Sequence, residues 1–409
     1  MVPKGWKKIP LEKVAEVRSG VAKGKSGLKD PIRVPYLRVA NVQDGNINLD
    51  EVKDIEIEKH QLDRYSLKYG DVLMNEGGDF DKLGRGDVWL GQLSPCLHQN
   101  HVFAVRPNQD SLDSFFLAAL AASRYGKLYF LRCSKRSTNL ASINSSQLKG
   151  FPVILPPLLE QKRITQILST WDKAIATTEQ LLANSQQQKK ALMQELLTGK
   201  KRFSGFSEKW KVVPLGKIFS RVTEKNSGCS TNVVTISAQH GLIRQEEFFK
   251  KAIASKILDD YFLINKGQFA YNKSYSIGYP MGAIKRLNRY EQGVVTALYI
   301  CFELSDLENA DGDYFEHYFE SGLLNKGLTQ IAHEGGRAHG LLNVKPSDFF
   351  TLCISLPPID EQKKIAGVLT NADFEIKALQ QKLNHLKQEK KALMQQLLTG
   401  KRRVKTEVA

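Results

Sequence analysis

Cysteine is scarce in this 409-residue chain, and its placement excludes two structural classes. The five cysteines are odd in number, far apart and never in a Cys-x-x-Cys pair: Cys96, Cys133, Cys229, Cys301 and Cys353. Neither a disulfide framework nor a structural zinc site is therefore expected.

Long apolar runs are also lacking, as is the apolar core of a signal peptide. We expect a cytoplasmic protein without membrane contact.

What the chain does contain is a long repeat. Residues 155–202 and 356–403 align without a gap, and 25 of the 48 aligned positions are identical. Both copies begin with Leu-Pro-Pro, continue with Glu-Gln-Lys, and end with Leu-Leu-Thr-Gly-Lys. A period this long does not fit a solenoid unit. It predicts a duplicated domain-plus-helix, with internal pseudo-two-fold symmetry.

Alternating spacings of four and three define a ladder of ten positions in each repeat, of which seven are apolar in the first copy and nine in the second. In the first copy these ladder positions are Ile164, Leu168, Trp171, Ile175, Thr178, Leu182, Ser185, Lys189, Leu192 and Leu196. In the second copy they are Ile365, Leu369, Ala372, Ile376, Leu379, Leu383, Leu386, Lys390, Leu393 and Leu397. Such spacing, kept over about five heptads, predicts a coiled-coil seam. Gly199 and Gly400 stand where a left-handed C-terminal cap is expected.

An internal two-fold axis would make the two helices antiparallel. The centred register then pairs Leu182 with Leu379. It also places Lys390 beside Trp171, which predicts a cation–π contact.

Weaker similarities extend the duplication beyond the helices. Trp6–Leu11 resembles Trp210–Leu215, and Gly70–Asn75 resembles Gly267–Asn272.

The fold class expected from these patterns is α+β, with mixed sheets in the globular parts. Strand-like runs fall at 35–41, 71–75, 101–106 and 293–302, and helical ones at 113–122 and 314–324. The expected organisation is a first globular domain over 1–155, a helix over 156–200, a second globular domain over 201–356, and a helix with a basic tail over 357–409.

The charge is strongly positive. Lysine and arginine number 59 against 43 aspartates and glutamates, for a formal net charge of +16 and a pI near 9.4. A surplus on this scale favours a polyanionic partner, because each neutralised phosphate releases condensed counterions. An acidic membrane surface is the competing interpretation, but the sequence has no basic amphipathic helix or lipidation motif. We therefore expect double-stranded nucleic acid as the partner.

Recognisable catalytic motifs are lacking. Residues 19–26 resemble a phosphate-binding loop, but a serine stands where its first glycine is required. No nucleophile elbow and no Gly-rich nucleotide loop after a strand is found in the sequence. His98 and His101 are three residues apart, but they lead into a strand rather than a helix. We expect polar contact to DNA or ordinary surface placement for these two, and no catalysis, metal or cofactor in this chain.

The repeated segments LPPLLEQKRI and LPPIDEQKKI, with KKALMQELLTGK and KKALMQQLLTGK, resemble the conserved regions of the specificity (S) subunit of Type I restriction-modification enzymes. The first domain resembles a target-recognition domain of that family in PYLRVANVQDGNI (35–47), LMNEGGDFDKLGRGDVW (73–89), HQNHVFAVRP (98–107) and STNLASINSSQLKGFPVILPP (137–157). The second domain does so in YNKSYSIGYPMGAIKRL (271–287) and EGGRAHGLLNVKPSDFF (334–350).

The resemblance implies a non-catalytic subunit that chooses the DNA sequence of a bipartite, asymmetric site. Two methyltransferase subunits would hold S-adenosylmethionine, and two motor-nuclease subunits would use ATP and magnesium. The long helices would set the spacer between half-sites and dock the methyltransferases. Met193 and Met394 lie off the ladder and are the expected docking positions.

Each target-recognition domain would lay loops into the major groove, where all four base pairs can be distinguished. The candidate DNA-binding residues of the first domain are Asn75, Lys82, Arg85, His98, Gln99, Asn100, Lys135, Arg136, Thr138 and Asn139. Those of the second are Asn272, Lys273, Tyr275, Tyr279, Lys285, Arg286, Arg337 and His339.

Two other functions stay open at this point. One is a single-chain enzyme that both recognises and modifies or cleaves DNA. The other is a coiled-coil interaction scaffold with an incidental basic surface.

Overall fold

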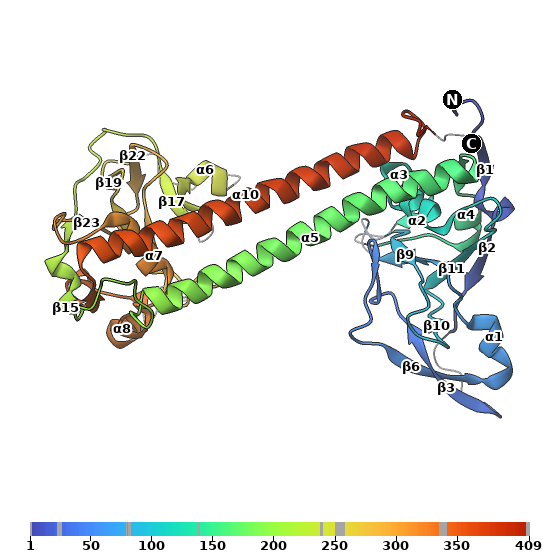
Figure 1. Ribbon diagram of the computed structural model, residues 1–409, viewed down its shortest axis with the longest axis horizontal. Helices are drawn as coiled ribbons and strands as arrows, with labels where there is room; N and C mark the ends of the chain where they lie inside the picture. The colour runs from blue at the N-terminus through green and yellow to red at the C-terminus, as the bar shows by residue number, and fades with distance from the viewer. Residues whose placement is uncertain are drawn as a thin grey trace. The chain divides into compact units, whose positions relative to one another are not determined.

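The structure is a computed structural model (Figure 1) that describes residues 2–22, 27–78, 80, 83–136, 140–237, 240–249, 258–334 and 342–405. The chain forms two compact units, which we call the first and the second unit: Met1–Glu179 with Gln381–Ala409, and Gln180–Gln380. Two long helices are divided between them. Each unit therefore contains the beginning of one long helix and the end of the other.

These helices, α5 (Leu158–Leu196) and α10 (Ile359–Leu397), are 39 residues each and account for the repeated segments. α5 contains neither glycine nor proline and is rich in leucine, alanine, glutamine and lysine, which favour helix. Gly199 and Gly400 follow the helices with φ of +69° and +70°. This is the left-handed conformation, so the predicted glycine caps are confirmed.

The two helices run antiparallel in the first unit. Lys390 of α10 forms an ion pair with Asp172 of α5, and Lys387 forms one with Glu179 at 2.7 Å. Residue numbers rise along α5 while those of the partners fall along α10, which fixes the direction. The expected stacking of Lys390 on Trp171 is wrong, because the neighbouring carboxylate of Asp172 takes the ammonium group.

The second unit shows the same direction. The Ser185 hydroxyl donates to Glu375 at 3.0 Å, and Lys189 pairs with Asp373 at 2.5 Å. All ladder positions of both helices are buried or half-buried, as an inward-facing stripe requires. Knobs-into-holes packing along that stripe stays a prediction.

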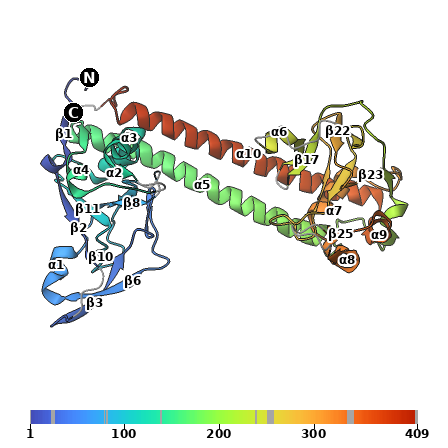
Figure 2. The ribbon, with the colours of Figure 1, turned by 180° about the vertical axis from the view of Figure 1, so that it is seen from behind.

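The first unit is built on a four-stranded antiparallel sheet. Its strands are β2 (Ala15–Ser19), β11 (Val102–Pro107), β7 (Val72–Asn75) and β9 (Gly86–Val88), in that spatial order. The helices α2 (Ser114–Ala122) and α3 (Arg124–Cys133) lie beside the first turns of α5 (Figure 2). The strands expected at 71–75 and 101–106 and the helix expected at 113–122 are thus confirmed.

Shorter elements complete the first unit. They are β1 (Lys7–Pro10), η1 (Leu11–Lys13), β3 (Pro31–Leu37), β4 (Val42–Gln43), β5 (Asn46–Ile47), β6 (Lys53–Glu58), η2 (Lys59–Gln61), α1 (Leu62–Tyr65), β8 (Gly77–Gly78), β10 (Leu97–His98), β12 (Lys135–Arg136), β13 (Ala141–Ser142), α4 (Ser145–Lys149) and β14 (Pro152–Leu155). Sheets of order β10-β3-β6 and β12-β13-β8 form, together with the pairs β1·β14 and β4·β5. The strand expected at 35–41 ends earlier, because the buried Asn41 side chain bonds to the Arg38 N–H and turns the chain.

The second unit repeats this arrangement. Its four-stranded antiparallel sheet has the order β16 (Phe219–Val222), β23 (Ile300–Leu304), β20 (Phe269–Asn272) and β21 (Ala283–Arg286). Its other elements are β15 (Lys211–Pro214), η3 (Leu215–Lys217), β17 (Val234–Ser237), β18 (Gly241–Arg244), α6 (Gln245–Phe248), β19 (Phe262–Asn265), β22 (Gln292–Val295), α7 (Gly312–Glu320), α8 (Asn325–Ile331), β24 (His333–Glu334), β25 (Leu342–Asn343), α9 (Pro346–Thr351) and β26 (Cys353–Leu356).

The duplication therefore extends from the sequence to the fold. β15 pairs with β26 as β1 pairs with β14, and the two four-stranded sheets share one strand order. One expected strand, 293–302, is two strands in the structure. A turn held by bonds from the Leu298 and Tyr299 N–H groups to Thr296 separates β22 from β23.

Each unit has its own hydrophobic core, to which the helix ends contribute. In the first unit, Ile164 and Leu168 of α5 and Leu397 of α10 join a buried cluster that includes Phe116 and Phe151. In the second unit, Ile365 and Leu369 of α10 join the corresponding cluster. Each globular part is thus packed against one end of both helices.

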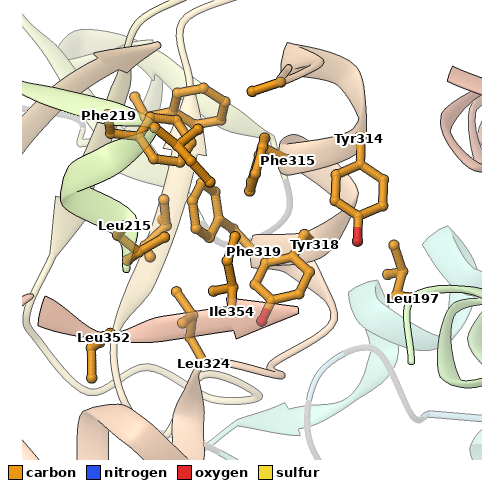
Figure 3. Close-up of a cluster of buried hydrophobic side chains, with 14 of the residues drawn as sticks. Leu197, Leu215, Phe219, Tyr314, Phe315, Tyr318, Phe319, Leu324, Leu352 and Ile354 are labelled. Atoms are coloured by element: carbon orange, nitrogen blue, oxygen red, sulfur yellow. The ribbon is translucent and has the colours of Figure 1, made fainter. Parts of the chain in front are cut away.

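Aromatic rings dominate the second core (Figure 3). The rings of Phe219 and Phe315 meet edge to face with centroids 4.9 Å apart. Met193 is buried in this cluster, and Met394 is half-buried against the first core. The expectation that these two methionines lie on outer faces, ready to dock a partner, is wrong, since their apolar side chains fill cores instead.

The glutamate of the repeated Glu-Gln-Lys segment joins distant parts of the chain. In the first unit Arg403 donates Nε to Oε1 of buried Glu160 at 2.7 Å and Nη2 to Oε2 at 2.8 Å, and Trp6 Nε1 donates to Oε2 at 3.0 Å. Burial alone would raise the pKa of Glu160, but the bonds from Arg403 and Trp6 outweigh it and leave the pKa below its ordinary value. Glu361 binds Arg202 and Trp210 in the same way in the second unit.

The neighbouring glutamine is equally occupied. Gln161 makes three bonds to backbone around the start of α5: to the carbonyls of Ser111 and Pro156, and from the N–H of Asp113. Gln362 makes the equivalent bonds in the second unit: to Asn309 and Pro357, and from Asp311. The repeated motif is therefore explained by its structural role in both units.

No helix within the described residues is both long enough and apolar enough to span a bilayer.

Candidate nucleic-acid interface

Three loops that are far apart in the sequence meet in the first unit. Glu76 follows strand β7, and its N–H donates to the His101 carbonyl at 3.0 Å. The Ile143 N–H donates to the Glu76 carbonyl at 2.9 Å. β13 pairs with β8 on one side and with β12 on the other. The described residues around 76–78, 101, 135–136 and 140–143 therefore lie next to one another.

A cleft of about 540 Å³ lies where these loops meet. It is lined by Val39, Glu76, Gly77, Gly78, His101, Lys135, Leu140, Ala141 and Ser142. Gly77 lies so close to β13 that an added Cβ would be 2.8 Å from the Ala141 carbonyl oxygen. The absence of a side chain at this position is what allows the two strands to approach each other.

The cleft contains an acid–base pair that the sequence interpretation did not include. The ring Nδ1 of His101 lies 2.5 Å from Oε2 of Glu76. The carboxylate is the less exposed partner, with 30% of the side chain accessible against 56% for the imidazole. Glu76 was not among the candidate residues predicted from the sequence. Only the position of Glu76 directly after a buried strand could have pointed to it.

Exposed basic side chains are frequent in the part of the chain that contributes Lys135 to this cleft. On α3, Arg124 and Arg132 are exposed eight residues apart, on one face of the helix, and Lys135 and Lys149 are exposed nearby in the chain. The sequence between Asp113 and Glu160 contains six basic residues and no acidic one. A face of this composition suits phosphate contacts, which position a protein on a duplex without reading its sequence.

Two candidate residues of the first domain are buried and hold the loops in place. The Asn75 side chain is fully buried and donates to the Val42 carbonyl at 2.9 Å. His98 is 2% exposed, and its Nδ1 lies 2.7 Å from the Val102 carbonyl oxygen, to which it donates. Burial lowers the pKa of His98 to about 4, so the ring is neutral at physiological pH. The expectation of direct DNA contact is therefore wrong for both, because neither side chain reaches the surface.

The remaining candidates of the first domain are distributed as follows. Arg85, Gln99 and Asn100 are half-buried, and Lys135 is exposed at the cleft. Arg136 is placed by its backbone in β12. Lys82, Thr138 and Asn139 lie outside the described residues.

The second unit brings the matching loops together. The Leu342 N–H donates to the Lys273 carbonyl at 2.9 Å, which joins the segment after β20 to β25. Asn272 caps the following turn by accepting a bond from the Ser274 N–H at 3.1 Å. Lys273 is half-buried, and burial, followed by the nearby charge of Arg221, lowers the pKa of its ammonium group. Tyr275 is 61% exposed beyond it.

Three further candidates of this domain are bound to acids on α7. Tyr279 and Lys285 both contact the carboxylate of Glu320. Arg286 pairs with Asp313 and lies 3.7 Å from Glu316. The structure thus gives these three side chains an internal role in bracing the sheet against α7. Arg337 and His339 lie outside the described residues.

The chain is similar to known proteins along nearly its whole length. The family described as Type I restriction modification DNA specificity domain matches residues 3–184. The putative type I restriction enzyme MjaX specificity subunit of Methanocaldococcus jannaschii is 27% identical over 432 residues, covering 99% of this chain and 95% of that protein. The MjaVIII specificity subunit of the same organism is 24% identical and covers 91% of this chain and 86% of that protein.

Solved structures share the fold. The HsdS subunit from Thermoanaerobacter tengcongensis has a TM-score of 0.54 at 17% identity, with 98% of each chain covered. The S subunit from M. genitalium has a TM-score of 0.55 at 13% identity, covering 97% of this chain and 96% of that one. Residues 3–184 thus match the DNA specificity domain of Type I restriction-modification systems, and over nearly its whole length the chain is similar to proteins named as specificity subunits of these systems.

Proposed function

We propose that this chain selects the target of a Type I complex by reading a bipartite, asymmetric DNA site. The target-recognition domain over 1–155 reads one half-site, and the domain over 201–356 reads the other. The observation that carries this proposal is the pair of units with one sheet order but different loop residues. Two domains that recognise different DNA sequences are expected to share a fold and to differ in the residues of their loops.

The division of labour within the first domain follows from its charge. The exposed cations of α3, with Lys149, contact phosphates and set the position on the duplex. Base edges in the major groove then face the cleft, where Glu76, His101 and Lys135 present polar groups. Positioning by phosphates is salt-dependent, so binding weakens steeply as salt rises.

The partners are two methyltransferase subunits and, in the full complex, two motor-nuclease subunits. S-adenosylmethionine, ATP and magnesium belong to those subunits, and this chain is non-catalytic. The apolar side chains on the outer helix faces support docking of a methyltransferase, because Leu181 is 47% and Phe374 is 64% exposed. The complex acts in the cytoplasm, where its DNA is.

The test is to co-express this chain with its methyltransferase and map modified bases in the host DNA. We expect one motif with two specific halves and a non-specific spacer. Purified complex should also shift duplexes that contain this motif more strongly than scrambled ones. Modification or binding without any sequence preference would contradict the proposal and favour the scaffold. Modification by this chain in the absence of the methyltransferase would favour the single-chain enzyme.

A further inference from the structure

The two units carry opposite charges at one equivalent position. Strand β7 of the first unit ends at Asn75, and strand β20 of the second ends at Asn272. These strands occupy the same place in the two four-stranded sheets. The next residue is Glu76 in the first unit and Lys273 in the second. Equivalent strands are thus followed by a glutamate in the first unit and by a lysine in the second.

In both units the carbonyl of this residue is bonded to the same part of the chain. The carbonyl of Glu76 accepts a bond from the Ile143 N–H, and that of Lys273 accepts one from the Leu342 N–H, both at 2.9 Å. In each case the donor lies on the segment that precedes the last short helix of the unit, α4 or α9. The backbone of Glu76 is held on two sides, because its N–H also donates to the His101 carbonyl, while that of Lys273 is held through its carbonyl.

The chemistry of Glu76 limits what it can do at a DNA interface. A carboxylate beside phosphates is repelled, so at a DNA interface it needs hydrogen-bond donors, which His101 supplies from the protein and a base can supply from the DNA. The major groove offers such donors in the amino groups of cytosine and adenine. A carboxylate has about four acceptor positions, and the bond from His101 uses one of them.

The chemistry of Lys273 is the reverse. An ammonium group has three donors and no acceptor, and the weak bond from Nζ to the Val344 carbonyl, at 3.5 Å, uses one. The matching pattern in the major groove is that of guanine, with acceptors at O6 and N7.

We propose that Glu76 and Lys273 are equivalent base-reading residues of opposite hydrogen-bond polarity. Glu76 accepts from the amino group of a cytosine or adenine in one half-site, and Lys273 donates to a guanine in the other. The inference rests on the proposed function, because it assumes that each unit reads one half-site. It adds which residue of each unit makes a specific contact and which base chemistry that residue selects.

The test uses the full chain assembled with its methyltransferase and duplex pools randomised at one half-site position at a time. The variants are Glu76→Lys and Lys273→Glu. For Glu76→Lys we expect the preference at one position of one half-site to move from cytosine or adenine to guanine, with discrimination of about 5- to 150-fold. Lys273→Glu should produce the opposite change at one position of the other half-site.

Glu12→Lys and Lys217→Glu are the matched controls. They make the same charge changes at exposed positions of η1 and η3. They should alter binding to all sequences alike and leave the base preferences unchanged. Glu76→Gln is a gentler variant for the case that Glu76→Lys does not assemble, and it should reduce the preference at the same single position.

The possible outcomes distinguish a failure of this inference from a failure of the proposed function. If wild-type complex shows no bipartite preference, the proposed function fails. If wild-type complex has a bipartite site and an assembled Glu76 variant keeps every base preference, the inference is overturned while the function stands. A change of preference in both half-sites with one variant would also overturn it.

Discussion

Arg403 and Glu160 form a bidentate ion pair although 243 residues separate them in the chain. The carboxylate is buried, while 44% of the Arg403 side chain is exposed. Removal of the arginine leaves a buried carboxylate with Trp6 as its remaining side-chain donor. Breaking a fully buried pair costs about 3–5 kcal/mol, and solvent screening reduces this to about 1–2 kcal/mol here.

We therefore expect Arg403→Ala to lower the melting temperature of the first unit by about 2–8 °C. Lys401→Ala is the control, because this neighbouring lysine is exposed. Arg202→Ala should weaken the second unit in the same sense, since Arg202 binds Glu361 in the equivalent way. Differential scanning calorimetry would resolve the two transitions. Equal melting of Arg403→Ala and wild type would show that the pair adds no stability.

The buried imidazole of His98 predicts a dependence of stability on pH. Its pKa is about 4 when folded, against an ordinary value of 6.5, so the unfolded chain binds a proton first as the pH falls. This contribution to stability is complete above pH 6.5 and is lost progressively as the pH falls towards 4. We expect a loss of about 2 kcal/mol between pH 7 and pH 5 from this group.

Urea titrations of wild type and His98→Asn would measure this loss. Asparagine keeps an N–H donor for the Val102 carbonyl but does not titrate. The variant should be less stable at pH 7 and should vary less with pH. A parallel pH dependence in both proteins would mean that His98 is not the group responsible.

Arg85 tests the independence of the two domains. Arg85→Ala should alter one half-site and leave the other intact, because the two loop surfaces belong to separate units. A base-reading arginine should cost about 1–3 kcal/mol at a single position, whereas a phosphate contact would weaken all sequences alike. Mapping of modified bases in cells distinguishes these results. Simultaneous relaxation of both half-sites would be incompatible with separate readers.

Phe374 tests the docking surface on the helices. Phe374→Asp replaces a large exposed apolar side chain on α10 with a charge, so we expect less methyltransferase to co-purify with this chain. Asn371→Asp adds the same charge on the same helix without removing an apolar group, and should leave the yield unchanged. Equal yields for both variants would place the docking surface elsewhere.

Helix length tests the origin of the spacer. A four-residue insertion next to Gln194–Leu197 would displace Leu196 and Leu197, which are buried in the second core. Duplication of residues 180–183 in α5 and of the equivalent 381–384 in α10 avoids this and can be absorbed as a stutter. Each helix then gains about 6 Å. We expect unchanged half-sites and a spacer longer by one or two base pairs, at about 3.4 Å per base pair.

Sequencing of modified DNA from cells with this insertion would show the new spacer directly. Insertion in α5 alone serves as a comparison, because it lengthens one helix against its partner. An unchanged spacer in an active complex would mean that these helices do not set the distance.

The helices, their caps and the duplication could be predicted because they depend on local periodicity. The ladder from Ile164 to Leu196 needs only the geometry of one helix. The roles of Asn75, His98 and Met193 could not be predicted, because a polar or apolar residue near a loop looks the same whether it faces solvent or a core. Their burial depends on segments distant in sequence, such as Val42 for Asn75. Glu76 was not predicted for a different reason. An acidic side chain is not an expected contact to a polyanion such as DNA until the residues around it in the fold are known.

The bonds that Arg403 makes have a consequence for the order of the segments along the chain. Besides Glu160, Arg403 Nη1 bonds to the Lys4 carbonyl at 3.0 Å, and Arg202 Nη1 bonds to the Glu208 carbonyl at 2.6 Å. In the second unit an uninterrupted segment connects these two points, while in the first unit the corresponding points lie near opposite ends of the sequence. The same bonds therefore form whether or not a short segment of chain joins the two bonded points. We therefore expect a circular permutant, with residues 403 and 4 joined by a short linker and the chain opened between residues 202 and 208, to form the same two units.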